Sequence, residues 1–277
     1  MHDQPMTFVE HLEELRRRLI YSAIALVVCT VVAYLISDLL FAWLARPLVQ
    51  AWRDAGLGQP KLHFANPIEP FATYIKVALL GGVFLAVPVI FYQLWCFVAP
   101  GLKPTERRYV IPFTLLSSAF FIGGAGFGYF VVFPLGFRFL LGFARADFGS
   151  LQRVFAAVGV TAGQGSLIAL EPTLMMSEYF SLVWRLLVAF GAIFELPLLL
   201  CFLALAGVVT HGALWRWNPY FIIVAFVLGA VLTPTPDVLT QSMMALPLIA
   251  LYNLGIGVAW LVARRRRAVP PGGGGAG

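Results

Sequence analysis

Charged residues are scarce in this sequence. Only 12% of the 277 residues are Asp, Glu, Lys or Arg, while 60% are hydrophobic. Soluble domains contain about 25% charged residues. A soluble fold of this length could not bury so many apolar side chains, whereas a lipid bilayer accepts them on the protein surface. The composition therefore excludes an ordinary soluble domain and indicates an integral membrane protein.

Cysteines and catalytic motifs are also scarce. Cys29, Cys96 and Cys201 lie in or beside apolar segments and form no CxxC pair, so we interpret them as small apolar residues. The sequence has neither HExxH nor GxSxG. Its glycine-rich segment, 123–128, does not match GxGxxG and indicates close helix packing. These features argue against an enzyme, a metal site and a bound cofactor.

What the sequence does contain is a series of long apolar segments. A transmembrane helix needs roughly 20 apolar residues, and five segments reach that length. One segment is shorter, at about 21 Å if helical. We therefore predict an all-α fold with about six transmembrane helices. Their predicted ranges are 19–40, 71–98, 109–141, 174–205, 219–232 and 239–262.

Basic residues cluster beside alternate ends of these segments. If the segments alternate in direction, all the clusters fall on one side of the membrane. Basic loops remain cytoplasmic, so we predict that both termini are cytoplasmic. The net charge of +6 is then a topology signal, not a nucleic-acid-binding surface. The predicted parts are a cytoplasmic N-terminal helix (1–18), a six-helix transmembrane domain (19–262) and a basic, then Pro/Gly-rich, cytoplasmic tail (263–277).

Two acidic residues lie on the predicted cytoplasmic side. Glu14 precedes Arg18 by four residues, and this spacing on a helix favours an ordinary ion pair. Glu106 lies between the second and third segments, where a single carboxylate is usually a solvated loop charge. Two carboxylates together suit a ligand with two guanidinium groups, because each guanidinium pairs bidentately with a carboxylate. We therefore consider Glu14 and Glu106 as one candidate binding site.

A third acidic residue, Glu195, lies inside an apolar segment. A carboxylate there costs several kcal/mol unless it is neutral or paired. Pro197 also cannot donate a hydrogen bond to the Ile193 carbonyl. We favour a functional intramembrane site over a buried structural bond. Arg185 is about 15 Å away along the helix, on another face, so we interpret it as reaching toward the interface.

Motifs along most of the chain resemble those of the TatC family, the signal-peptide receptor of the twin-arginine protein translocase. No single motif is decisive, but their order and spacing match from about Val9 to Val262. The motifs are HLEELRRR at 11–18, YQLW at 92–95 with Phe97, AP at 99–100, ERR at 106–108, YFVVFP at 129–134, FELP at 194–197, and TPTPD at 233–237 with Gln241.

The resemblance implies a multi-pass protein of the cell inner membrane that binds twin-arginine signal peptides of folded cargo. It implies oligomeric assembly with TatA-like and TatB-like single-span proteins, transport on the proton-motive force, and no cofactor. By position, Glu14 and Glu106 would accept the arginines, Arg16 and Phe97 would lie beside them, and Glu195 would face the partner helices. Further matched positions are Pro47, Asp237 and Gln241.

Other features differ from the family pattern or suit another function. Arg185 is unfamiliar, Asn253 stands where some relatives have an acidic residue, and the segment 142–173 is long. The alternative function is a proton-coupled secondary transporter that uses Glu195 as a proton relay. Such a transporter would show an internal repeat, and the sequence shows no convincing one. A membrane enzyme would need a catalytic constellation, which is not visible.

Overall fold

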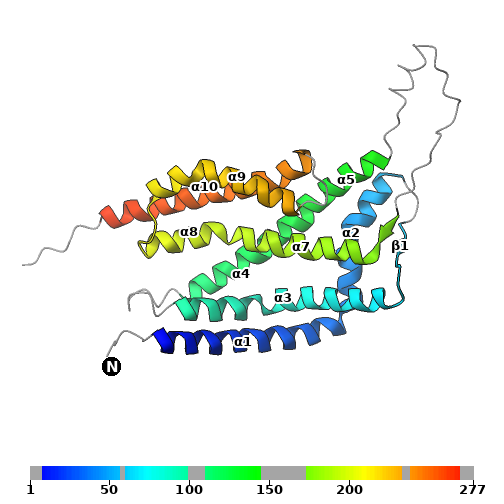
Figure 1. Cartoon of the computed structure of the whole chain (residues 1–277), viewed down its shortest axis with the longest axis horizontal. Helices are drawn as coiled ribbons and strands as arrows, with labels where there is room; N and C mark the ends of the chain where they lie inside the picture. Colours follow the sequence, from blue (N-terminus) through cyan, green and yellow to red (C-terminus); the bar gives the residue numbers. More distant parts are fainter. Residues whose placement is uncertain (1–7, 57–59, 99–109, 145–172, 233–237, 269–277) are drawn as a thin grey trace, which may run out of the picture.

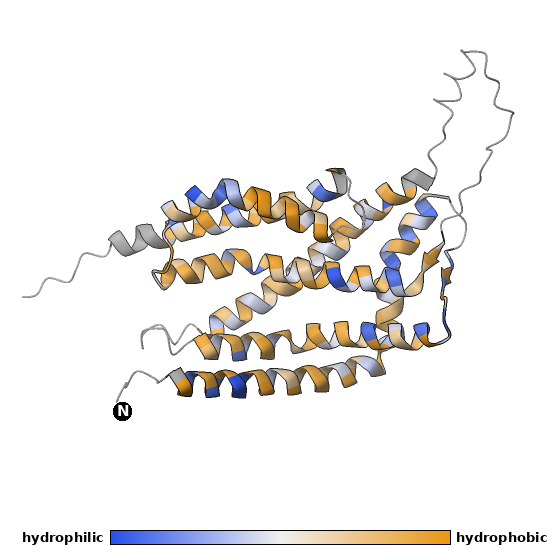
Figure 2. Ribbon diagram, in the orientation of Figure 1, coloured by the Kyte–Doolittle hydropathy of each residue, from blue (hydrophilic) through white to orange (hydrophobic). Residues whose placement is uncertain are grey.

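The computed structural model describes residues 8–56, 60–98, 110–144, 173–232 and 238–268. Most of these residues are helical (Figure 1). Within the described ranges, six helical segments are long and apolar enough to cross a membrane, which confirms the predicted all-α membrane fold. Figure 2 shows hydrophobic residues along these helices. The segments are Val9–Leu35, Ile68–Val98, Val110–Leu141, Met176–Leu205, His211–Leu232 and Gln241–Leu261.

The first span is a single helix, α1 (Phe8–Leu35), that packs along α3 (Ile68–Val98). We predicted a cytoplasmic helix over 1–18 and a span over 19–40; within the described residues, α1 runs without a break from Phe8 past residue 19 and ends at Leu35. The close packing of α3 against α1 depends on Gly82 of α3, because a Cβ added there would lie 2.7 Å from the Cα of Thr30 on α1. Glycine at such a contact lets two helices approach closely in lipid.

The segment 41–70, which we expected to be an outer loop, contains most of the helix α2 (Ser37–Asp54). This helix is amphipathic and buries Leu44, Leu48, Ala51 and Trp52, which recur at helical spacing. Its charged residues, Asp38, Arg46, Arg53 and Asp54, make it too polar for a membrane span. A search for long apolar runs therefore missed it.

One tyrosine compensates for a proline inside α2, and a second tyrosine bonds the next carbonyl. Pro47 has no N–H, so it leaves the Trp43 carbonyl without its helical donor. The Tyr129 hydroxyl donates to that carbonyl at 2.6 Å. The Tyr179 hydroxyl donates to the next carbonyl, that of Leu44, at 2.7 Å. These bonds hold α2 against the third and fourth spans.

The third and fourth spans are both interrupted. The third comprises α4 (Val110–Phe127), a π-helical turn η3 (Gly128–Val132) and α5 (Phe133–Ala144). The fourth comprises α7 (Met176–Phe194) and α8 (Leu196–Leu205), which meet at Glu195. Each interruption lies just before a proline, which cannot continue the helical hydrogen-bond ladder.

The last two spans form a hairpin that packs on α8. Helix α9 (His211–Leu232) begins before the predicted 219–232 and has Pro219 in its interior. Helix α10 (Val238–Ala268) continues beyond the predicted end at Val262, through the basic run 264–267. The extra lengths contain polar or charged residues, such as Arg216 and Asn218 in α9 and the arginines 264–267 in α10, and these interrupt the apolar runs on which the predicted bounds depended.

Alternate helix ends gather at opposite ends of the bundle (Figure 1). The start of α1, the end of α3, the α8–α9 turn and the end of α10 lie at one end. The other end holds α2, α5 and a short parallel pairing of β1 (Leu62–His63) with β2 (Leu174–Met175). These two strands are a minor addition to a helical fold.

The predicted close packing of the glycine-rich segment holds for two of its four glycines. Gly124 and Gly128 lie against Phe190 on α7, whereas Gly123 and Gly126 have no neighbour near an added Cβ. Contacts between α4 and α7 therefore depend on one face of α4. The other face is free to carry larger residues.

Gly124→Ala should destabilise the protein by about 1–3 kcal/mol, because its Cβ would lie 2.7 Å from Phe194 Cβ and force the helices apart. Thermal unfolding in detergent measures this effect. Gly123→Ala is the matched control, since no atom lies within 4 Å of its added Cβ. Equal unfolding temperatures for both variants would contradict the proposed packing contact.

Candidate functional site

The first candidate site lies where the start of α1 meets the end of α3. His11 on α1 stacks on Phe97 of α3, with ring centroids 4.5 Å apart and an interplanar angle of 16°. This contact fixes the two helix ends side by side. Phe97, a predicted site residue, thus lies beside the N-terminal helix. His11 was not predicted as a site residue, although it is part of the HLEELRRR motif.

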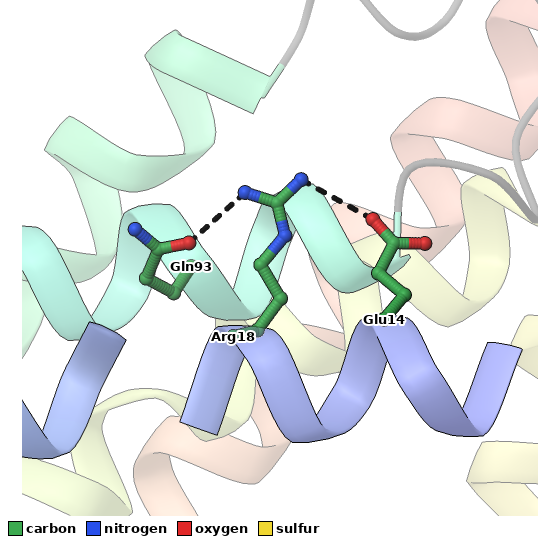
Figure 3. Close-up of polar contacts among 3 residues, drawn as sticks. All are labelled: Glu14, Arg18 and Gln93. Atoms are coloured by element: carbon green, nitrogen blue, oxygen red, sulfur yellow. Dashed lines mark hydrogen bonds and ion pairs between the residues drawn. The ribbon is translucent and has the colours of Figure 1, made fainter. Parts of the chain in front are cut away.

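A polar network lies on the same pair of helices (Figure 3). Arg18 donates to Glu14 Oε1 at 3.2 Å, which confirms the predicted i,i+4 ion pair. Its other terminal nitrogen donates to Gln93 Oε1 on α3 at 3.0 Å. The Glu14 side chain is only 10% exposed and that of Arg18 23%. Gln93 was not predicted as a site residue, although it is part of the YQLW motif.

This network leaves hydrogen-bonding capacity unused. Glu14 Oε2 and Arg18 Nε are both buried and have no partner among the described residues. A buried polar atom without a partner costs about 1–3 kcal/mol. Arg18 holds the Glu14 carboxylate in a fixed position by one oxygen, and the other oxygen remains able to accept a bond. A cationic or hydrogen-bond-donating ligand would satisfy it.

The other predicted residues of this site are placed less centrally. Arg16 is exposed, and it lies two residues from Glu14, which on a helix puts it on a different face. Glu106 lies outside the described residues, and so does Asp237. The predicted proximity of Glu14 and Glu106 therefore remains a prediction.

Glu195 is half-buried at the junction of α7 and α8. Ser117 of α4 is a side-chain hydrogen-bond partner of its carboxyl group. The Ser117 hydroxyl is fully buried and also accepts the Trp95 indole N–H at 3.0 Å. Glu195 Oε1 is buried without a partner among the described residues. The carboxyl group therefore has both a structural bond and a free acceptor atom.

The remaining matched positions have structural contacts. Pro47 is buried in α2, as described above. Gln241 Nε2 donates to the Phe226 carbonyl at 2.8 Å and ties α10 to α9. Asn253, the position that departs from the family pattern, accepts a bond from Asn218 Nδ2 at 3.1 Å. These contacts hold the last hairpin together.

Arg185 lies apart from Glu195, as the sequence predicted. It is exposed, and its Nε donates to the Ser181 carbonyl at 3.3 Å.

Within the described ranges, no three His, Cys, Asp or Glu side chains gather to hold a metal ion. What both candidate sites offer a ligand is a carboxyl oxygen without a hydrogen-bond partner among the described residues.

Comparisons with known proteins agree along most of the chain. The family model described as Sec-independent protein translocase protein (TatC) matches residues 10–247. The chain is 43% identical over 254 residues to the Sec-independent protein translocase protein TatC of Desulforapulum autotrophicum, covering 92% of this chain and 84% of that protein. It is 38% identical over 257 residues to the TatC of Koribacter versatilis, covering 93% and 86% respectively.

A solved structure is also similar. It is described as "Crystal Structure of Twin Arginine Translocase Receptor- TatC", with a TM-score of 0.74 and 38% identity. The alignment covers 92% of this chain and 100% of that chain. These matches confirm the resemblance found in the sequence.

Ser117→Ala should lower the free energy of unfolding by about 1–3 kcal/mol, because it leaves the buried Trp95 N–H and the Glu195 carboxyl without their shared partner. Ser118→Ala is the matched control. The Ser118 hydroxyl is also buried but donates only to the Thr114 carbonyl of its own helix, at 2.8 Å. Thermal unfolding measures the stability of both variants. An equal loss of stability in the two would argue against the shared hydrogen bond of Ser117.

Proposed function

Because the chain belongs to the TatC family of Sec-independent protein translocase proteins, we propose that it is the receptor subunit of a twin-arginine translocase. In this function it binds the twin-arginine signal peptides of folded proteins and nucleates assembly of the translocation complex. It is a multi-pass membrane protein that acts with other subunits of the translocase. The proposed activities are therefore recognition of a signal peptide and assembly of a protein complex.

The observation that carries the proposal is the unpartnered oxygen of Glu14. Arg18 binds Oε1, so the carboxylate is held in place while the buried Oε2 is still available. A peptide guanidinium donates several N–H groups in a planar fork, and it binds a carboxylate more strongly than a neutral donor does. Such a ligand would give the buried Oε2 its missing hydrogen bond, and the Glu14 carboxylate would then lie between two guanidinium groups.

Glu106 is proposed as the acceptor for the second arginine. The described part of α3 ends at Val98, one residue beyond the Phe97 ring that stacks on His11. Glu106 follows Val98 by eight residues, which span at most about 28 Å when extended. The distance along the chain therefore allows this carboxylate to reach the start of α1.

The proposed orientation places this end of the bundle in the cytoplasm. The start of α1, the end of α3, the α8–α9 turn and the end of α10 lie together in Figure 1. The basic clusters of the sequence adjoin these same helix ends. Basic segments favour the cytoplasmic side, which is also where a signal peptide on folded cargo would be presented.

Glu195 is proposed as the docking point for TatA-like and TatB-like single-span partners. Its free Oε1 lies at a helix break within the fourth span. A polar side chain on a partner helix would bond this atom, and hydrogen bonds of that kind contribute to helix association in lipid. The proton-coupled transporter considered from the sequence has no comparable support, since the family match includes residue 195.

Glu14→Ala and Glu106→Ala should each weaken binding of a twin-arginine peptide by about 10- to 100-fold, because a hydrogen bond to a charged group contributes about 1.5–3 kcal/mol. Affinity for the wild-type protein should also fall as salt rises. Fluorescence anisotropy of a labelled peptide with protein in detergent measures both effects.

Glu13→Ala is the matched control for this experiment. Glu13 is exposed and adjacent to Glu14 on the same helix, so its removal changes the net charge equally. It should alter affinity by less than about threefold, and a twin-lysine peptide should bind the wild type weakly. Unchanged affinity in both Glu14→Ala and Glu106→Ala would exclude these residues from the receptor site.

Glu195→Gln should keep much of the transport activity, because glutamine can still bond Ser117 and a partner side chain. Glu195→Ala should lose transport while its abundance stays normal. Export of a reporter with a twin-arginine signal peptide measures transport, and immunoblotting measures abundance. Reduced abundance of Glu195→Ala would indicate a structural bond only, and normal export by that variant would refute the docking function.

A further inference from the structure

A cleft with polar and apolar walls lies away from the proposed receptor site, at the opposite end of the bundle. Its volume is about 560 Å³, and it lies between α3, α5 and the first half of α7. Two cations, Lys76 and Arg185, line it together with Glu178, so its net formal charge is +1. Apolar residues form much of the remaining wall, among them Leu48, Phe137, Leu140, Leu141 and Leu182.

Both cations lie well inside membrane-spanning helices. Lys76 is eight residues from the start of α3, or about 12 Å along the helix, and Arg185 is nine residues from the start of α7, or about 14 Å. A cation at such depth is costly unless it pairs with a counter-charge or reaches water. Neither forms an ion pair within the described ranges.

The two cations converge on one serine. Lys76 Nζ donates to Ser181 Oγ at 3.0 Å, and Arg185 Nε donates to the Ser181 carbonyl at 3.3 Å. The Ser181 hydroxyl accepts from Lys76, so its own proton is directed elsewhere. Ser177, Ser181 and Arg185 follow one another at four-residue spacing and therefore share one face of α7. This face of α7 contributes one positive charge, that of Arg185, and Lys76 of α3 contributes the second charge beside it.

We propose that this cleft binds the phosphate group of an anionic membrane phospholipid. The converging donors match phosphate oxygens, which accept charge-assisted bonds from lysine and arginine. The apolar wall provides a surface for acyl chains. Basic pockets between transmembrane helices bind phospholipid head groups in this way. A soluble anion would use the same donors but would gain nothing from the leucine and phenylalanine side chains.

The test is titration of delipidated, detergent-solubilised full-length protein with phosphatidylglycerol, phosphatidylcholine or inorganic phosphate. Thermal unfolding and native mass spectrometry measure binding. Phosphatidylglycerol should bind and raise the unfolding temperature. Lys76→Gln and Arg185→Gln should each weaken its binding about fivefold, and the double variant about 25-fold, since each basic residue near an anionic lipid contributes about a fivefold effect.

Two further variants make the test independent of folding defects. Glu178→Gln removes the negative charge in the cleft, so it should strengthen phosphatidylglycerol binding. Arg53→Gln removes an exposed cation of α2 that does not line the cleft, and it should have no effect. Equal binding of phosphatidylcholine, or full binding by the double variant, would overturn the proposal. Equal stabilisation by inorganic phosphate would show a general anion site and overturn the lipid assignment.

Discussion

Backbone hydrogen bonding in lipid is the constraint on which most of this structure depends. No water reaches the hydrocarbon core, so each carbonyl that a proline deprives of its donor needs another partner or a local break. Tyr129 supplies that partner at Trp43, opposite Pro47. Pro197 instead accompanies the break at Glu195, where α7 ends and α8 begins. The Tyr129 hydroxyl and the Glu195 carboxyl group are therefore both found beside an interruption of the helical ladder.

The candidate sites share a second physical feature, which is a carboxyl group that is held by one hydrogen bond while its other oxygen has no partner among the described residues. Arg18 binds one oxygen of Glu14 and leaves the other free. Ser117 bonds Glu195, whose Oε1 remains unpartnered. A fixed group with an unsatisfied atom is preorganised, so a ligand loses less conformational entropy on binding. This shared feature underlies both proposals, recognition at the start of α1 and assembly within the membrane.

Helix packing in this bundle relies on small residues on particular faces. Gly82 brings α3 against α1, and Gly124 brings α4 against α7. Sequence alone predicted that the glycines near residue 124 serve packing, but not which of them do so. Gly123 and Gly126 have open space beside them, because they lie on another face of the same helix. The positions of the neighbouring helices decide which face of a helix is packed. The composition of the glycine-rich segment carries no information about those positions.

The sequence by itself determined the fold class, the family and the approximate spans, because long apolar runs and ordered motifs are local properties of the chain. It also predicted Glu14, Phe97 and Glu195 as site residues. Tertiary structure decided what those residues contact: Gln93 completes the Arg18 network, and Ser117 bonds Glu195. It also revealed α2, whose amphipathic pattern is shorter than a span. These features depend on contacts between distant segments, and no local pattern in the chain encodes such distances.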